Sequence, residues 1–317
     1  QKCFEQASFM LIYFYRNLIK GRCILKNVSL KNIRKDIVSG IIVALVSIPI
    51  SMGYAQIAGL PAVYGLYCSI LPVLIYGLVT SSPQFVFGVD ATPAALVGGT
   101  LATLGIVSGS EEAKAVVPSI TLVAALWLLL FFFIKAGRIV NYISTPVMGG
   151  FISGIGVTII LMQAAKLFGG NAGTGEAIKL LMHIAGEMKS FNLLSAVLGV
   201  GTVIIILIAK KFIPKFPMSV LLMVLGALAT AIFHIDRCGV KLLPHVDKGL
   251  PGFSLPDMSV VFKNPSEIIL LGLSVAGVVM AQTLLATNNY ANKYGYKVSN
   301  NREILSYAAA NAASAVI

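Results

Sequence analysis

One carboxylate lies inside an apolar stretch of this 317-residue sequence, and it is the residue best placed to do chemistry. Asp90 stands in the run Gln84-Phe-Val-Phe-Gly-Val-Asp-Ala-Thr-Pro-Ala-Ala-Leu-Val-Gly-Gly99. An ionisable side chain at the centre of a membrane helix costs roughly 2.5–3.5 kcal/mol, so such a residue is a functional hypothesis by default. Two interpretations stay open: Asp90 only caps a helix, or it caps a helix and also lines a binding site.

The residues on the two sides of Asp90 favour different backbone conformations. Phe85–Val89 is aromatic and β-branched, which is typical of an extended segment, whereas residues 91–104 are small and favour a helix. Asp is a preferred N-cap, and Pro93 is acceptable in a first helical turn. The sequence therefore predicts a span that is broken in mid-membrane, with a helix beginning at Asp90.

A helix that begins inside the membrane presents free N–H groups and the positive end of its dipole, and both attract anions. Discontinuous helices of this kind form substrate sites in secondary transporters. Because the charge of Asp90 would repel an anion, we expect this carboxyl to be protonated, or neutralised by a cation, during transport.

Two other apolar segments carry polar side chains. Pro49 is expected to interrupt the first span, where Tyr54 either anchors the helix at the membrane interface or faces a site. The eighth span has a polar cluster that either bridges helices or lines a wet cavity: Gln282, Thr283, Thr287, Asn288 and Asn289. Because no basic residue stands deep inside a span, backbone amides and helix dipoles are expected to bind the anion.

The composition indicates that lipid is the solvent around these elements. Hydrophobic residues make up 57% and charged residues 11% of the chain, against about 25% charged in soluble domains. Runs long enough to cross the bilayer are expected at about 37–58, 61–79, 85–107, 115–134, 143–165, 191–209, 217–235 and 267–290. A ninth begins near residue 304, so the sequence is expected to end inside a longer bundle.

The net charge of +12 would also suit a nucleic-acid partner, but its distribution favours a membrane topology. With a cytoplasmic N-terminus, most Lys and Arg residues fall in the leader and inner loops, and most acids fall outside. The four cysteines are too far apart for a zinc site or an evident disulfide framework. We recognise neither an enzymatic constellation nor a phosphate-binding loop, so we expect no enzyme activity, no cofactor and no nucleic-acid partner.

Longer motifs give the sequence a family resemblance. Asp36–Pro49, followed by Gly53-Tyr-Ala-Gln-Ile-Ala-Gly-Leu-Pro-Ala-Val-Tyr-Gly-Leu-Tyr67, resembles the signature of sulfate permease (SulP) anion transporters. Thr145–Gly154 and Asn292–Ile304 also resemble stretches of that family. The resemblance implies secondary transport of inorganic anions, such as sulfate, bicarbonate or chloride, by alternating access.

The resemblance also implies an all-α integral membrane fold of seven plus seven spans in two inverted repeats, truncated here after about eight to nine spans. The expected parts are a cytoplasmic basic leader (1–36), a first repeat (37–235), an extracytoplasmic loop (236–266) and the start of the second repeat (267–317). A homodimer in the plasma membrane is expected, with an inorganic anion and the lipid bilayer as partners.

By position, the resemblance implies a substrate site that is built from Tyr54, Asp90, Ala91, Thr92, Gln282 and Thr283. Ala91 and Thr92 would donate backbone N–H groups. Cation-coupled members carry a carboxylate where this chain has Gln282, so H⁺ or Na⁺ coupling would have to use another residue, and Asp90 is the candidate. Two alternatives are a nucleobase–cation symporter of the same fold and a non-transporting membrane scaffold.

Overall fold

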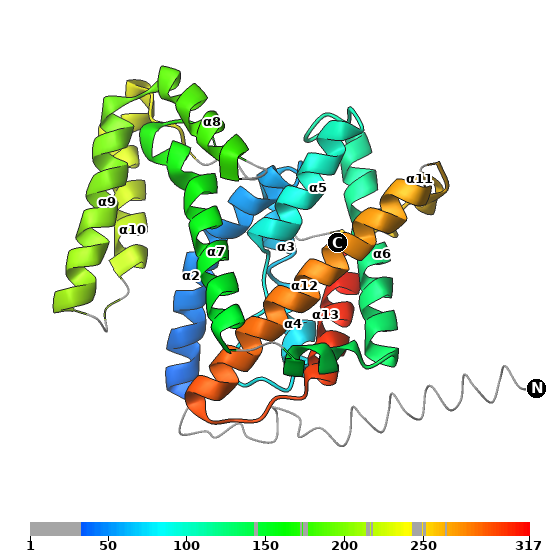
Figure 1. The fold of residues 1–317 in the computed structure, drawn as a ribbon. Coiled ribbons are helices and arrows are strands. Elements are labelled where there is room, and N and C mark those ends of the chain that lie inside the picture. Colours follow the sequence, from blue (N-terminus) through cyan, green and yellow to red (C-terminus); the bar gives the residue numbers. More distant parts are fainter. Residues whose placement is uncertain are drawn as a thin grey trace, which may run out of the picture.

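The computed structural model describes residues 33–142, 145–171, 173, 177–213, 216, 218–242, 249, 252–263 and 265–317. Over these residues the chain forms helices joined by turns and short extended segments, and no strand occurs among them (Figure 1). The predicted all-α architecture is confirmed for this part of the chain. Residues 1–32 of the predicted basic leader lie outside the described residues.

The α-helices are α2 (Ile33–Ile57), α3 (Ala62–Tyr67), α4 (Leu71–Val79), α5 (Ala91–Thr103), α6 (Glu111–Phe133), α7 (Thr145–Ala164), α8 (Ala177–Glu187), α9 (Leu193–Phe212), α10 (Met218–Phe233), α11 (Met258–Lys263), α12 (Pro265–Tyr294) and α13 (Asn300–Ser314). Short 3-10 turns include η2 (Ala136–Tyr142) and η3 (Ala165–Phe168).

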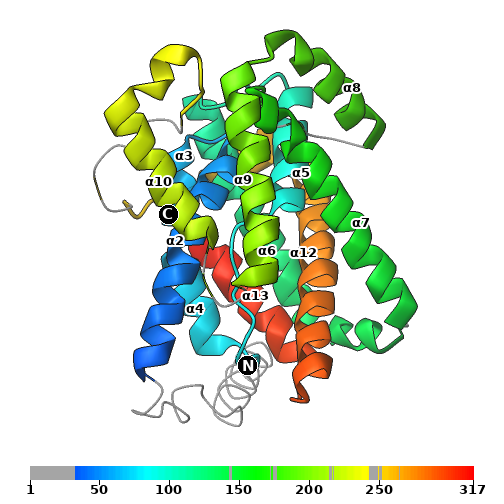
Figure 2. The same ribbon diagram turned by 90° about the vertical axis from the view of Figure 1, so that its left-hand side faces the viewer.

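The helices pack into two groups (Figures 1 and 2). In the first group α6 packs against both α12 and α13, α13 packs against α4, and α5 lies between α2 and α12. In the second group α7 contacts α8, and α9 contacts α10 and η3. We call these the core group (α2–α6, α12 and α13) and the outer group (α7–α10).

The centre of the core group is buried and apolar. Side chains from α6, α12 and α13 that are fully enclosed there are Ile120, Leu128, Leu284, Ile304 and Tyr307. Helix α12 approaches α6 closely at Gly272, where an added Cβ would lie 2.5 Å from a methyl group of Val123. The crossing therefore requires glycine, and it holds the second-half helices α12 and α13 firmly against the first half.

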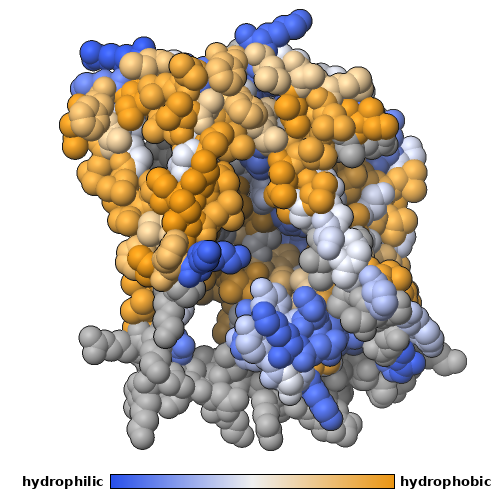
Figure 3. Space-filling model, turned by 60° about the vertical axis from the view of Figure 1, so that its left-hand side comes forward, coloured by the Kyte–Doolittle hydropathy of each residue, from blue (hydrophilic) through white to orange (hydrophobic). Residues whose placement is uncertain are grey.

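The outward faces are apolar, as expected for helices in lipid. Five helical stretches among the described residues are long and apolar enough to cross a membrane: Asp36–Ile57, Ala62–Val79, Glu111–Phe133, Leu193–Phe212 and Pro265–Tyr294. Figure 3 shows hydrophobic side chains over most of the face that carries α9 and α10, with hydrophilic ones mainly toward its two ends. Such a surface would be insoluble in water, and it suits a bilayer.

Several predicted spans differ in detail. Pro49 does not interrupt the first span, since α2 runs unbroken through it; membrane helices tolerate proline because neighbouring groups satisfy the freed carbonyl. The second span, predicted as one run over 61–79, is instead divided into α3 and α4 at Cys68–Ile70. Pro72 lies in the first turn of α4, and without an N–H it cannot continue the hydrogen-bond ladder from α3.

Helix α8 lies where only a loop was expected after the fifth span. Leu180 is buried on one side of it, while Ile178, Leu181 and Met182 are exposed on the other. Its terminal Glu187 accepts a 2.9 Å hydrogen bond from the Asn171 N–H. Eleven residues are too few to cross a bilayer, so α8 is not a membrane span.

Candidate functional site

The third span is broken at Asp90, as predicted. Residues 85–90 are extended, and α5 begins at Ala91. Asp90 has β-region dihedrals (φ −123°, ψ 147°), and its Oδ1 accepts a 2.8 Å hydrogen bond from the Ala91 N–H. Pro93 fits the first turn, where its missing N–H costs nothing. A helix N-terminus therefore lies beside a carboxylate inside the core group.

An aromatic stack holds the extended segment in place. The Phe87 ring stacks on Tyr76 of α4 at 5.3 Å between centroids and on Tyr307 of α13 at 5.7 Å. Phe85 meets Tyr76 edge-on at 6.1 Å. Aromatic pairs of this kind contribute about 0.5–1.5 kcal/mol each beyond area burial, so they fix a segment that has no helical hydrogen bonds of its own.

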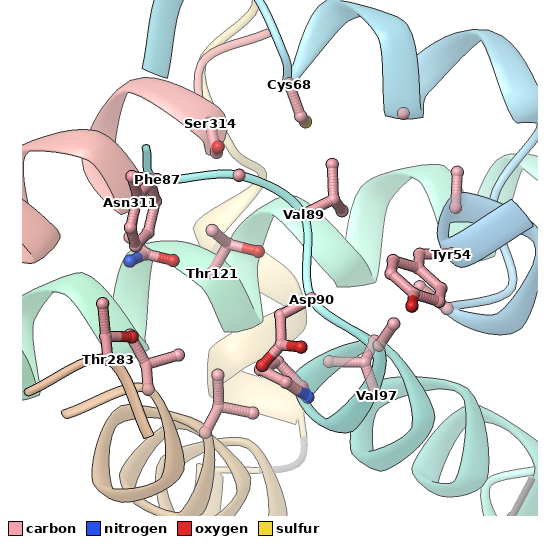
Figure 4. A pocket seen from close by; sticks show the side chains of 18 of the residues that line it. Tyr54, Cys68, Phe87, Val89, Asp90, Val97, Thr121, Thr283, Asn311 and Ser314 are labelled. Carbon is pink, nitrogen blue, oxygen red and sulfur yellow. The ribbon is translucent and has the colours of Figure 1, made fainter. Parts of the chain in front are cut away.

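A cavity of about 490 Å³ opens along this segment (Figure 4). Its walls come from α2, α3, the extended segment, α5, α6, α12 and the end of α13. The walls are mostly apolar, and the lining residues with polar side chains are few: Tyr54, Tyr64, Cys68, Asp90, Thr121, Gln282, Thr283, Asn311 and Ser314. A largely apolar pocket with a few convergent polar groups is the usual form of a small-ligand site.

The six predicted site residues lie together, although only four line the cavity. Tyr54, Asp90, Gln282 and Thr283 belong to its wall. Ala91 is 1% exposed, and its N–H is donated to Asp90. The Thr92 hydroxyl accepts a 2.9 Å hydrogen bond from Gln282 Nε2, which joins α5 to α12. The assignment of all six to substrate binding stays a prediction.

Gln282 is the cavity residue whose side-chain oxygen lacks a hydrogen-bond donor within the described part of the chain. Its Oε1 is buried and has no hydrogen-bond partner among the described residues. A buried acceptor without a donor costs about 1–3 kcal/mol. A ligand, a water molecule or a protonated group that donates to this oxygen would therefore be stabilised beside Asp90.

Two other polar residues of the eighth span, Thr287 and Asn288, bridge helices, while Asn289 is exposed. The Thr287 hydroxyl donates to the Thr283 carbonyl at 2.7 Å and lies 3.2 Å from the Tyr307 hydroxyl. Asn288 Nδ2 donates to Asn300 Oδ1 at 2.8 Å. Both alternatives for this cluster thus apply, to different residues: one end lines the cavity, and the other end holds α13.

Sequence reasoning missed several residues at the cavity. Phe87, Thr121 and Asn311 line it, but no local motif marks them, because α6 and α13 reach the site only through the tertiary fold. Lys166 was passed over because it stands just beyond the fifth span. Its Nζ lies 3.4 Å from the point where a Cβ on Gly53 would stand, one residue from Tyr54. A cation therefore lies against α2 near the site, which the sequence alone did not indicate.

Comparisons with known proteins show which family the sequence matches. The family model described as "Sulfate permease family" matches residues 33–317. A probable sulfate transporter of Mycobacterium tuberculosis is 26% identical over 283 residues, which is 89% of this chain and 50% of that protein. Sulfate transporter 2.2 of Arabidopsis thaliana is 28% identical over 298 residues, which is 89% of this chain and 44% of that protein. The chain thus spans about half the length of these relatives.

Two solved structures show the same fold. The structure of SLC26A9 aligns with a TM-score of 0.78 at 21% identity, over 98% of this chain and 52% of that one. The transmembrane domain of BicA, a cyanobacterial bicarbonate transporter, aligns with a TM-score of 0.72 at 18% identity, over 91% of this chain and 74% of that one. At these identities the likeness carries the fold alone.

Proposed function

Because the chain belongs to the sulfate permease family, a family of permeases rather than of enzymes, we propose that it carries inorganic anions across the membrane by secondary active transport. One observation carries the proposal: a helix N-terminus opens at Asp90 beside a cavity between packed membrane helices. Such an N-terminus attracts an anion without a fixed basic clamp.

Different groups at the cavity would contribute to anion binding in different ways. The positive end of the α5 dipole attracts the anion, and the Tyr54 and Thr283 hydroxyls offer hydrogen bonds from α2 and α12. The apolar walls lower the local dielectric constant, which strengthens these interactions. Since Asp90 opposes an anion while it is charged, a proton or Na⁺ at this carboxyl would let the anion bind, and this linkage would couple the two fluxes.

The substrate is proposed to be sulfate or a related oxyanion, with bicarbonate and chloride as competitors. The family description and the named sulfate transporters support sulfate, and they favour an anion over a nucleobase. Gln282 also supports this choice, since a nucleobase–cation symporter would be expected to carry a carboxylate there.

The mechanism is proposed to be alternating access, in which the core group moves past the outer group with the anion in its cavity. In this proposal 37–235 forms a first repeat, 236–266 an extracytoplasmic loop and 267–317 the start of an inverted second repeat. A plasma-membrane homodimer with a cytoplasmic N-terminus belongs to the same proposal. The two groups meet in a small apolar cluster, in which Met162 of α7 and Leu180 of α8 pack with Ile57, Ala91 and Ala94, and such a limited contact would allow this movement.

Uptake in proteoliposomes tests the proposal. Radiolabelled sulfate, bicarbonate and uracil are offered separately, each with and without a Na⁺ or pH gradient. We expect sulfate or bicarbonate uptake that a cation gradient stimulates, and no uracil uptake. Uptake of uracil alone would support the symporter alternative, and uptake of none of the three would support the scaffold.

The Asp90→Asn variant tests the coupling. Its uptake should lose the stimulation by the gradient, because a neutral amide neither repels the anion nor binds the cation. Glu111→Gln is the control, since Glu111 pairs with Lys114 at 2.7 Å on the exposed first turn of α6. Unchanged gradient dependence in Asp90→Asn would exclude Asp90 as the coupling residue.

A further inference from the structure

Glu303 is a fully buried carboxylate that the proposed transport step does not use. It lies in the first turns of α13 and is 0% exposed. No ion pair reaches it within the part of the chain that the structure describes. A buried charge without such a partner is expensive unless hydrogen bonds satisfy it. The arrangement around Glu303 therefore needs a specific set of donors.

Those donors all come from the end of α4 and the residues after it. The Tyr76 hydroxyl donates to Oε2 at 2.8 Å, and the Ser81 N–H and hydroxyl both donate to Oε1 at 2.6 Å. The Thr80 hydroxyl lies 2.9 Å from each carboxylate oxygen. Hydrogen bonds to a charged acceptor are shorter and about twice as strong as neutral ones. Glu303 is thus satisfied entirely by groups from residues 76–81.

The neighbouring residue, Arg302, binds a backbone carbonyl of the same segment. Arg302 Nε donates to the Val79 carbonyl at 2.6 Å. The Ser299 N–H donates to the Ser81 hydroxyl oxygen at 3.1 Å, and the Tyr296 hydroxyl lies 3.1 Å from that of Ser82. Residues 296–302, at and just before the start of α13, therefore form hydrogen bonds with both donors and acceptors of residues 79–82. Apolar packing alone would not give such a specific contact.

Residues 79–82 form the end of α4 and the bend that leads into the extended segment at the cavity. Beyond Ser82 the chain continues through Phe85 and Phe87 of the aromatic stack to Asp90, where α5 begins. Tyr76 belongs to both arrangements, because its hydroxyl binds Glu303 and its ring stacks on Phe87. Any shift at Glu303 is thus passed to the wall of the cavity.

We propose that Arg302 and Glu303 form a clamp on residues 79–82 that sets the position of the extended segment 85–89, and with it the Asp90 end of the cavity. Glu303 is a positioning residue that acts on the site through Tyr76 and Ser81. The clamp also joins the first half of the chain to the α12–α13 pair, so that both sides of the cavity move as one body. This inference rests on the proposed function only where it concerns anion affinity.

Two tyrosines of the same stack offer a matched pair of variants. Tyr76→Phe removes the hydroxyl that binds Glu303, whereas Tyr307→Phe removes a buried hydroxyl that faces Thr287. Both changes keep the ring and its stacking. Glu303→Gln, in which one oxygen becomes an amide that opposes its donors, is the third variant.

Anion uptake by the full chain in proteoliposomes gives the first measurement. We expect Tyr76→Phe and Glu303→Gln to raise the KM for sulfate by up to about tenfold, the change that follows if the free energy of one lost hydrogen bond to a charged group is passed in full to the cavity, with a smaller change in maximal rate. Tyr307→Phe should keep its KM within about twofold, since a neutral bridge is weaker. Equal changes in all three variants, or changes in maximal rate alone, would overturn the clamp.

A labelling measurement does not depend on transport. Val86→Cys places a reporter thiol on the extended segment at the cavity wall, in a background whose four native cysteines are alanine. Glu303→Gln and Tyr76→Phe should alter the rate at which a charged maleimide labels this thiol at least threefold, while Tyr307→Phe should not. Labelling rates that stay equal in all variants would refute the clamp, even in a protein that transports nothing.

Discussion

The crossing of α2 and α5 can be tested by one methyl group. Gly98 of α5 lies so close to the Ile57 carbonyl that an added Cβ would overlap its oxygen, and it would lie 3.5 Å from the Ala58 Cα. These neighbours are backbone atoms, which cannot rotate away as a side chain can. The next residue, Gly99, has no atom within 4 Å of the same point. Gly98→Ala and Gly99→Ala are therefore the same chemical change with and without an obstacle.

The size of the effect follows from this pairing. Replacing glycine by alanine inside a helix stabilises it by roughly 0.5–1 kcal/mol, and both variants share this gain. Overpacking a closely packed site costs about 1–3 kcal/mol, and only Gly98→Ala carries this cost. Since the shared gain cancels, we expect Gly98→Ala to be about 1–3 kcal/mol less stable than Gly99→Ala.

The measurement compares thermal unfolding in detergent with sulfate uptake in proteoliposomes. We expect Gly99→Ala to melt at or above the wild-type temperature with normal uptake. Gly98→Ala should melt lower and transport more slowly, because the displaced α5 carries the Asp90 N-cap away from Tyr54 on α2. Two variants with the same melting temperature and the same uptake would refute the close crossing and the reasoning built on it.

Three further predictions concern single side chains. Lys166→Gln should raise the KM for sulfate several-fold, most strongly at low salt where the ammonium attracts anions best, while the exposed Lys179→Gln should leave it unchanged in the same uptake assay. Thr92→Val should lower the thermal stability by about 1–3 kcal/mol, because it leaves Gln282 Nε2 without its acceptor; a melting temperature equal to that of wild type would contradict this. The hydrogen bond from the Asn171 N–H holds the pKa of Glu187 below its usual range. The contribution of this hydrogen bond to the docking of α8 is therefore present above the unfolded-state pKa of Glu187, and it is lost as the pH falls through the lower folded-state pKa. The protection of α8 amides against hydrogen exchange, relative to their intrinsic rate at each pH, should therefore fall on acidification below about pH 4.3 in wild type, and Glu187→Gln should abolish that dependence.

The broken third span could be predicted because its signals are local. An N-capping Asp, a proline two residues into the helix and a preceding aromatic and β-branched stretch all lie within ten residues of one another. Each signal acts through the backbone at its own position, so no knowledge of the fold is needed. The structure places the first residue of α5 at Ala91, directly after the predicted cap.

Other features depend on what a segment packs against. Pro49 looks like a helix breaker, yet α2 continues through it, whereas Pro72 does end the ladder between α3 and α4. The same residue type gives two outcomes, because neighbouring groups decide whether a freed carbonyl is satisfied. Glu303 shows the same limit: its sequence position suggests a solvated helix start, and only the tertiary fold buries it against Tyr76 and Ser81.

A broken span can exist only if its exposed backbone is satisfied from elsewhere. A continuous helix closes its hydrogen bonds internally, but the non-helical residues 80–90 cannot, and lipid offers no replacement. Partners therefore have to come from other helices, as the Ser81 N–H does from Glu303 and the Ala91 N–H does from Asp90. Both of these partners are carboxylates, one at each end of the extended segment. The acids that hold this backbone in place would therefore also border the anion site that is proposed here.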